Sequence, residues 1–338
     1  MSNLGGPVVL CFGIVDEADI VEDFLEYHLS LGIDGFVAVD VGSTDGTLDI
    51  LSRYERSGRL HLTRRSDPTA HGQHWLGALT AHARDTFHAS WCLFCDPDEF
   101  WVFPEGDAPT YLATAPAPIV SFPRYNLLPT TLAETGETAH YRNFDLVVRR
   151  PLEFLYDLQR LGEPGGVEWM LNAHPPDILR FIGPKVLVRA DVIRAIKPGF
   201  HDVEAFDPAS PRHRETRGYI GHFQVRDAAR FTNKARRVAD FIAVNPPHTN
   251  AATSRHWVRL AALYRSGLVG AEYDRQILGP EAIAACLREG VIERDPRVAA
   301  RLARLNPPTA AAFSTASYGA RTGSARHPLK RSAHGAIE

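Results

Sequence analysis

The sequence predicts an α/β protein with a single Rossmann-like, mostly parallel sheet, followed by an irregular α+β C-terminal part. Apolar, β-branched runs alternate with amphipathic helical patterns between residues 8 and 95, which is typical of successive βα units. Strands joined by single helices are connected by right-handed crossovers and therefore become parallel neighbours. Together, these two observations predict an open sheet covered by helices.

Each element of this region has its own signal. Residues 8–12 form a continuous apolar run, as expected of a strand buried on both faces. The next helix has acidic residues at its start and Gly32 after its end. The predicted strands are residues 8–12, 36–39, 60–63 and 91–95, and the predicted helices are residues 20–31, 48–56 and 73–87.

The second half has a less regular pattern, which is why we expect an α+β arrangement there. Its predicted strands are residues 119–122, 185–189 and 221–225, and its predicted helices are residues 226–244, 254–264 and 280–289. Residues 307–338 are rich in Ala, Ser, Thr and Gly, so we expect a disordered tail.

Composition excludes several classes of protein. The chain has 338 residues and a net charge of -3, so it has no general attraction for nucleic acid. Residues 1–7 lack the basic and apolar regions of a signal peptide, and no run approaches the roughly 20 apolar residues that span a bilayer. Only 4 cysteines are present, so we expect a cytoplasmic protein without a disulfide framework.

Cys92 and Cys95 have the spacing of a metal or redox pair, but they lie in the predicted strand 91–95. Residues three apart on a strand point to opposite faces, so the two sulfur atoms should not converge. We therefore expect both to be core residues.

Polar clusters follow three of the predicted strands. They are Asp16-Glu17, residues 40–45 and residues 96–99. Open α/β sheets bind ligands beyond the carboxyl ends of their strands. We therefore expect the three clusters to meet along one edge of the sheet and form a site there.

The third cluster, Asp96-Pro97-Asp98-Glu99, places three carboxylates within four residues. A solvated acidic turn is the simplest alternative, because such triplets are common. The position directly after a buried strand favours a site instead. Carboxylates held close together need a cation, and hard oxygen ligands suit Mg²⁺ or Mn²⁺. Such an ion can neutralise charge on a departing diphosphate.

The chain resembles a known family in these segments. The stretch from Asp16 through the turn 42–47 resembles the donor-binding half of family-2-like glycosyltransferases. Residues 91–100 resemble the subgroup whose Trp-led strand ends in Asp-x-Asp-Glu-Phe. The resemblance implies the nucleotide-diphospho-sugar transferase fold and a hexosyltransferase type of activity. It also implies a donor-binding half over residues 1–115 and an acceptor and catalytic half over residues 116–306.

The resemblance also implies roles for individual residues. Asp40 would contact the nucleoside and Glu17 would line the same pocket, while Asp96 and Asp98 would hold metal and donor. Asp45 is placed with the donor-binding residues. Two departures from the family are Asp16, where Asn is usual, and Val41, where Asp or Asn is usual. Asp16 lacks the two amide donors of Asn and adds a charge, which changes the contacts available to a base.

In the second half, the subgroup has histidines that match His201 and His222, and either could complete the metal site. A structural, hydrogen-bonded histidine is the alternative for each. The base that accepts the proton of the attacking hydroxyl is expected to be a carboxylate. Asp202 and Glu204 are the candidates because they adjoin His201, with Glu168 as an outsider.

Four basic residues fall four, four and three positions apart and form one stripe on the predicted helix 226–244: Arg226, Arg230, Lys234 and Arg237. The stripe could be a solvated face, which is usual for charged stripes. It could also be a cationic wall for the donor diphosphate or a phosphorylated lipid acceptor. Lys234 has a counterpart in the subgroup, and Lys185 is a second candidate for the diphosphate.

The sequence therefore predicts a metal-dependent glycosyltransferase that uses a nucleotide-diphosphate sugar, with a UDP-sugar as the expected donor. The acceptor would be a glycan or a lipid-linked molecule, and by analogy the expected setting is bacterial surface glycan synthesis, with at most peripheral membrane contact. A sugar nucleotidyltransferase is one alternative, although the acidic residues after the first strand argue against triphosphate binding there. A non-catalytic nucleotide-sugar-binding protein of the same fold is the other.

Overall fold

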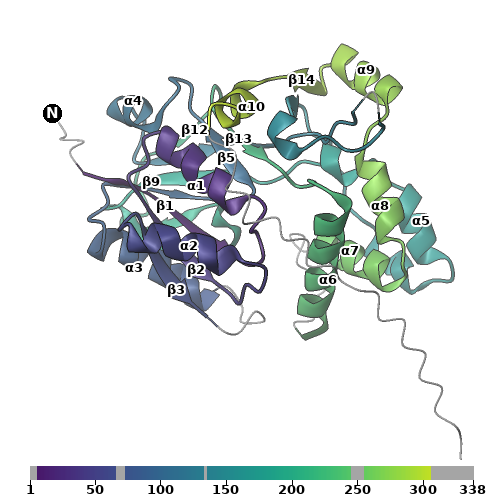
Figure 1. Cartoon of the computed structure of the whole chain (residues 1–338), viewed down its shortest axis with the longest axis horizontal. Helices are drawn as coiled ribbons and strands as arrows, with labels where there is room; N and C mark the ends of the chain where they lie inside the picture. The colour runs from purple at the N-terminus through teal and green to yellow at the C-terminus, as the bar shows by residue number, and fades with distance from the viewer. Residues whose placement is uncertain (1–5, 66–72, 133–134, 245–254, 306–338) are drawn as a thin grey trace, which may run out of the picture.

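A seven-stranded sheet forms the centre of the N-terminal part of the molecule (Figure 1). The computed structural model describes residues 6–65, 73–132, 135–244 and 255–305. The strand order is β12-β6-β9-β4-β1-β2-β3, and β9 runs antiparallel to both of its neighbours. The other pairs are parallel. The strands are β1 (Val8–Ile14), β2 (Gly35–Asp40), β3 (Leu60–Arg64), β4 (Trp91–Phe94), β6 (Ile119–Phe122), β9 (Lys185–Arg189) and β12 (Arg212–Arg214).

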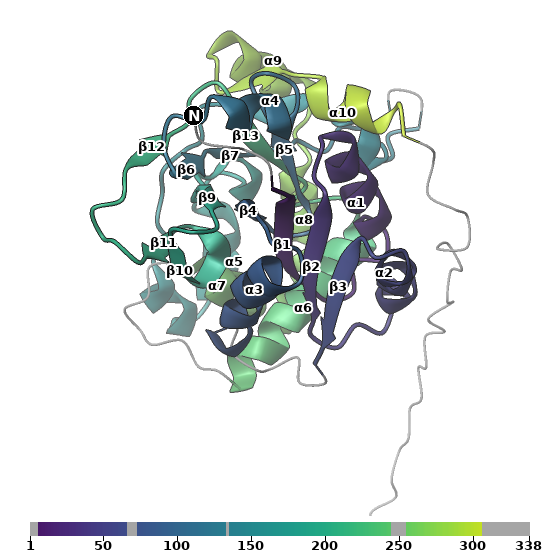
Figure 2. The ribbon, with the colours of Figure 1, turned by 90° about the vertical axis from the view of Figure 1, so that its left-hand side faces the viewer.

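Helices cover both faces of this sheet (Figure 2). Helices α1 (Val21–Ser30) and α2 (Thr47–Arg56) pack on the face that carries Leu10 and Phe12. Helix α3 (Gln73–Asp85) packs on the opposite face. The predicted single, mostly parallel α/β sheet is confirmed, and burial of alternate residues of β1 in two separate cores explains why its sequence is apolar throughout.

The two cysteines of the central strand region lie in different cores. Cys92 belongs to the core under α3, whereas Cys95 belongs to the core under α1 and α2. Both are free and buried. The prediction that their sulfur atoms do not converge is confirmed.

A smaller, three-stranded sheet has the order β5-β13-β7. Strand β5 (Glu99–Val102) begins four residues after Cys95 and pairs antiparallel with β13 (Tyr219–His222). Strand β13 in turn pairs parallel with β7 (Arg124–Asn126). The sequence did not predict β5, and it placed the strand around residue 221 two residues too late. This sheet matters because it carries residues from both halves of the chain to one place.

Helices α5 to α9 of the second half gather on the right in Figure 1. Helix α6 packs against α7 and α8. Among the described residues, no helix has the length and apolar character that a membrane crossing requires. The predicted tail, residues 307–338, lies outside the described residues. The helices are α4 (Ala108–Ala113), α5 (Gly166–Asn172), α6 (Ala228–Val244), α7 (Arg255–Arg265), α8 (Val269–Gln276), α9 (Pro280–Arg288) and α10 (Arg297–Leu302).

Short strands complete the second half: β8 (Leu146–Val148) pairs with β14 (Ile292–Arg294), and β10 (Ile193–Ile196) pairs with β11 (Val203–Ala205). These pieces have no regular alternation with helices, so the irregular α+β C-terminal part is confirmed as well.

Candidate functional site

The loops after β1 and β2 are hydrogen-bonded to each other. The backbone N–H of Asp16 donates to Oγ of Ser43 at 3.0 Å, and the N–H of Thr44 donates to Oδ1 of Asp16 at 2.7 Å. The N–H of Glu17 donates to Oγ1 of Thr47 at 2.9 Å. The first two polar clusters therefore meet at one edge of the sheet, as the sequence predicts.

Asp40 holds the turn that follows β2. Its side chain is buried, and Oδ1 accepts from the N–H groups of Gly42 and Ser43 at 3.0 and 3.1 Å. Oδ2 accepts from the Ser43 hydroxyl. The carboxylate thus shapes the loop at which we expect the nucleoside, and its role in nucleoside contact stays a prediction.

In the third cluster, the carboxylates of Asp96 and Asp98 point to different partners. The N–H of Glu99 donates to the carbonyl of Asp96 at 3.1 Å, which closes the turn around Pro97. Asp96 is 45% exposed, and its Oδ2 accepts from Nζ of the buried Lys185 at 2.7 Å. Asp98 is buried, and its Oδ2 lies 3.4 Å from Nε2 of His222.

His222 reaches Asp98 because of strand pairing. In the antiparallel pair of β13 and β5, His222 lies opposite Glu99, next in sequence to Asp98. Its Nδ1 is 2.7 Å from Oδ1 of Asn126, and Nδ2 of Asn126 donates to the carbonyl of Ile178 at 2.8 Å. Since the amide nitrogen is used by that carbonyl, Oδ1 of Asn126 accepts and Nδ1 of His222 carries the proton.

The protonation of the pair follows from its surroundings. Burial lowers the pKa of His222, although Asp98 opposes this effect. Burial also favours the neutral acid at Asp98, but His222 and Lys234 outweigh it and hold the pKa of Asp98 well below its ordinary value. A neutral imidazole whose proton is on Nδ1 presents a lone pair at Nε2 to an ionised carboxylate. Lys234 supplies one positive charge here, with Nζ 3.5 Å from Oδ2 of Asp98, and a divalent cation bound between Nε2 of His222 and the carboxylate would use both of these atoms as ligands.

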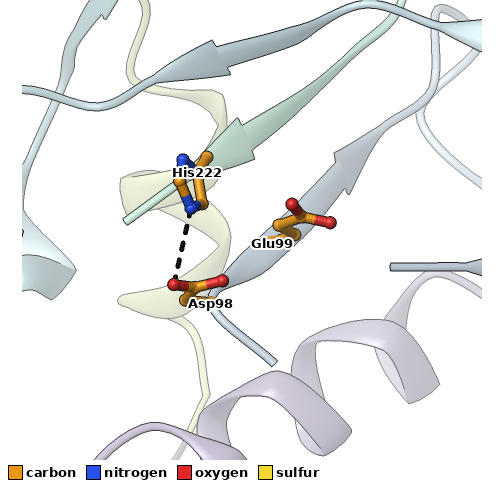
Figure 3. A group of neighbouring side chains, drawn as sticks. All are labelled: Asp98, Glu99 and His222. Atoms are coloured by element: carbon orange, nitrogen blue, oxygen red, sulfur yellow. Dashed lines mark ion pairs between the residues drawn. The ribbon is translucent and has the colours of Figure 1, made fainter. Parts of the chain in front are cut away.

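Glu99 also belongs to this group. One donor atom from each of Asp98, Glu99 and His222 lies within 4.8 Å of the others, and Figure 3 shows Asp98 and His222 facing each other beside Glu99. Glu99 is fully buried and is already paired with Arg124 and, at 3.4 Å, with Lys185. Burial raises the pKa of Glu99, but these two cations outweigh it and keep the pKa low. Glu99 is therefore an anchored carboxylate, whereas Asp98 and His222 turn their side chains toward each other.

The fit to a divalent cation rests on this donor set. Protein metal sites commonly combine a carboxylate oxygen with one imidazole nitrogen of a histidine, while the other imidazole nitrogen donates its N–H to an orienting acceptor. Asn126 supplies the orienting acceptor for His222. The residues present thus fit Mn²⁺ or Mg²⁺ at Asp98 and His222.

The basic stripe packs onto the acidic edge of the sheet rather than facing solvent. Arg226 lies just before α6, has an 8% exposed side chain and pairs with Glu17 and, at 2.8 Å, with Asp19. It also lies 4.0 Å from Asp98, so it links the first and third polar clusters. The remaining pairs are Arg230 with Asp19 and Asp45, Lys234 with Asp98, and Arg237 with Asp16 and Glu17.

Other predicted site residues lie apart from this group. Nδ1 of His201 donates to the carbonyl of Pro184 at 2.6 Å, and its ring packs against Gly199. Asp202 pairs with Lys197 and Arg212, and Glu204 is exposed and pairs with Arg194. Within the described part of the chain, none of the three has a hydrogen bond or ion pair to Asp98 or His222.

Sequence reasoning missed Asn126, Arg124 and Asp19. Asn126 and Arg124 lie on β7, a three-residue strand without a recognisable pattern, and they reach the site only through its pairing with β13. Asp19 had a signal, since it belongs to the same acidic run as Asp16 and Glu17.

With this geometry established, comparison with known proteins gives one family. Residues 6–151 match the model of glycosyltransferase family 92. The resemblance to a glycosyltransferase inferred from the sequence is thereby confirmed. The family 92 match extends from before β1 to after β8, so it includes Asp98, Glu99 and Asn126 but ends before His222 and α6. No curated protein gives a significant match.

Solved glycosyltransferase structures show weak overall similarity to the chain. S. aureus TarS 1-349 in complex with UDP is 11% identical, with 84% of this chain and 92% of that chain covered and a TM-score of 0.36. Glucosyl-3-phosphoglycerate synthase from Mycobacterium tuberculosis, in complex with Mn²⁺, UDP and phosphoglyceric acid, is 13% identical. The match covers 73% of this chain and 81% of the synthase chain, with a TM-score of 0.34. At these TM-scores no residue role rests on either structure.

Proposed function

We propose that this protein is a metal-dependent glycosyltransferase that moves a sugar, of hexosyl type, from a nucleotide-diphosphate donor to an acceptor hydroxyl. One observation carries the proposal: Nε2 of His222 and the ionised carboxylate of Asp98 face each other at 3.4 Å inside a chain whose first part matches a glycosyltransferase family. A carboxylate oxygen and an imidazole nitrogen placed this close can bind one divalent cation together, and a cation at this edge of the sheet suits a diphosphate.

Asp98 and His222 would hold Mn²⁺ or Mg²⁺. When bound, such an ion supplies positive charge that stabilises the departing nucleoside diphosphate. Asp96 stays with the donor-binding residues, because Lys185 already pairs with its carboxylate.

Lys234 is the residue of the stripe best placed for the diphosphate. Its Nζ lies 3.5 Å from Oδ2 of Asp98, and its side chain is 38% exposed. It can therefore turn toward an anionic group beside Asp98 and balance the charge that develops on the leaving oxygen. Lys185 is fully buried and serves to hold Asp96 and Glu99.

The nucleoside would lie at the loops after β1 and β2, next to Asp40, Glu17 and Asp45. We propose a UDP-sugar as donor and a glycan or lipid-linked molecule as acceptor, in the cytoplasm and in the setting of bacterial surface glycan synthesis. Four free cysteines agree with a reducing compartment.

Release of UDP from a panel of UDP-sugars, with water as the acceptor, tests this function. We expect slow hydrolysis of at least one donor with Mn²⁺, loss of that activity with EDTA, and loss in Asp98→Ala with the fold retained. Glu105→Ala is a matched control, because Glu105 pairs with the exposed Arg217 away from the site. Full activity in EDTA or in Asp98→Ala would contradict the proposal, and UDP binding without any hydrolysis would favour the non-catalytic alternative.

A further inference from the structure

Gln224 carries a buried acceptor without a partner. Its Nε2 donates to Oδ2 of Asp177 at 3.0 Å, and because an ionised carboxylate only accepts, this contact fixes the orientation of the amide. Oε1 of Gln224 is then buried and has no hydrogen-bond partner among the described residues. A buried oxygen without a hydrogen-bond donor is unfavourable, so we expect a ligand to supply a donor there.

Asp177 keeps an acceptor site open beside that oxygen. Its Oδ1 accepts from the hydroxyl of Tyr156 and from Nε of Arg180, each at 2.6 Å. Its Oδ2 accepts only from Gln224 among the described residues. The side chain of Asp177 is 13% exposed.

The pair lies directly beside the residues that would hold the metal. Asn126 bonds to His222 through one end of its amide and to the carbonyl of Ile178, the residue after Asp177, through the other. Gln224 follows His222 by two residues, and the intervening Phe223 donates its N–H to the carbonyl of Asp98 at 2.8 Å.

We propose that Asp177 and Gln224 form the acceptor subsite, and that it binds two neighbouring hydroxyl groups of a sugar or polyol. This inference rests on the proposed function. One hydroxyl donates to Oε1 of Gln224. The other donates to Oδ2 of Asp177 and is the attacking group. Its oxygen forms the bond to the anomeric carbon, its proton passes to Asp177, and the bond from that carbon to the diphosphate breaks with its electron pair leaving on the phosphate oxygen.

This assignment replaces Asp202 and Glu204 as the acceptor-side carboxylates. Those two lie on or beside the hairpin of β10 and β11, where basic side chains pair with them. Asp177 has what they lack: a connection through Gln224 and Asn126 to the segment that carries His222.

The test uses the full chain with Mn²⁺, the UDP-sugar that is hydrolysed fastest, and methanol or ethylene glycol as acceptor. Asp177→Asn should lower transfer to ethylene glycol at least ~100-fold while the affinity for UDP and Mn²⁺ is unchanged. Asp177→Glu should recover part of the rate. Asp157→Asn is the matched control and should transfer normally, because Asp157 is 51% exposed and its only ion pair within the described part of the chain is with Arg160.

Gln224→Met tests the second hydroxyl, since methionine fills the same space without a carbonyl oxygen. The wild-type protein should prefer ethylene glycol to methanol, and this preference should disappear in Gln224→Met. Wild-type rates in Asp177→Asn with UDP binding intact, or an unchanged preference in Gln224→Met, would overturn the inference alone. Absence of any UDP binding by the wild-type protein would defeat the proposed function, and the inference with it.

Discussion

Asn126 is the residue that gives His222 its role. Its amide is fixed by the carbonyl of Ile178, and this leaves only an acceptor for Nδ1 of His222. Nε2 of His222 therefore faces Asp98. Partners of this kind orient metal-binding histidines in proteins generally.

Asn126→Ala should therefore weaken Mn²⁺ binding by about 10- to 100-fold, because His222 would lose its orientation and its preferred tautomer. Calorimetric titration with Mn²⁺ measures this change. Asn143→Ala is the control, since Asn143 is exposed and should leave the affinity as it is. Equal affinities in all three proteins would show that His222 does not bind the metal.

Asp40 is expected to act on the nucleotide without the metal. Its carboxylate holds the turn at Gly42 and Ser43, so Asp40→Ala should loosen the loop that receives the nucleoside. The variant should lose UDP affinity in the presence and in the absence of Mn²⁺, whereas Asp98→Ala should lose it mainly when Mn²⁺ is present. Calorimetry with UDP would contradict this division if both losses depended equally on the metal.

At the residue scale, sequence reasoning placed Asp98 and His222 in one set of candidates but could not separate the members of that set. Asp96 and Asp98 are equivalent in the motif, and only the fold directs the first to Lys185 and the second to His222. His201 and His222 were likewise indistinguishable. The orienting residue Asn126 lies 96 positions before His222, and no local pattern connects them.

At the scale of elements, α6 and the residue before it decide how the two halves of the chain meet. The sequence left two interpretations of the basic stripe open, a solvated face or a cationic wall. The structure shows a third arrangement, in which the stripe pairs with carboxylates at the ends of β1 and β2. Lys234 and Asp98 form the part of this contact nearest to the proposed metal.

Arg226→Met should destabilise the protein by about 3–5 kcal/mol, because it leaves the carboxylates of Glu17 and Asp19, which are 15% and 11% exposed, without their main partner. Urea denaturation measures the loss. Arg236→Met is the control: Arg236 is 48% exposed and pairs with Asp240 one turn away, so about 0.3–0.5 kcal/mol is expected. Similar losses in both variants would show that the stripe does not join the halves.

Helices and strands could be predicted where the residues that stabilise them lie within the same segment of sequence. Strands β1 to β4 and their helices were predicted because burial on both faces and helical periodicity are visible within each segment. Strand β5 was missed because Glu99, which is buried in it, is a charged residue in an acidic motif. It is stabilised there by Arg124 and Lys185, which are distant in sequence.

At the scale of the whole molecule, the site is complete only when both halves are present. Asp98 and Asn126 lie inside the segment that matches family 92, whereas His222, Lys234 and Arg226 lie beyond it. Strand β13 brings His222 next to β5 and β7, and α6 closes over the ends of β1 and β2. This division explains why the fold of the first half was predicted well, while the metal site needed the pairing of distant strands.

The most direct test of the central claim is the affinity of the full chain for UDP, measured by calorimetry with Mn²⁺ and again with EDTA. We predict that Mn²⁺ strengthens UDP binding by the wild-type protein and that this gain is lost in His222→Ala, even though His222 lies outside the family 92 segment. Binding of UDP that is equally strong with EDTA, or unchanged in His222→Ala, would contradict the account.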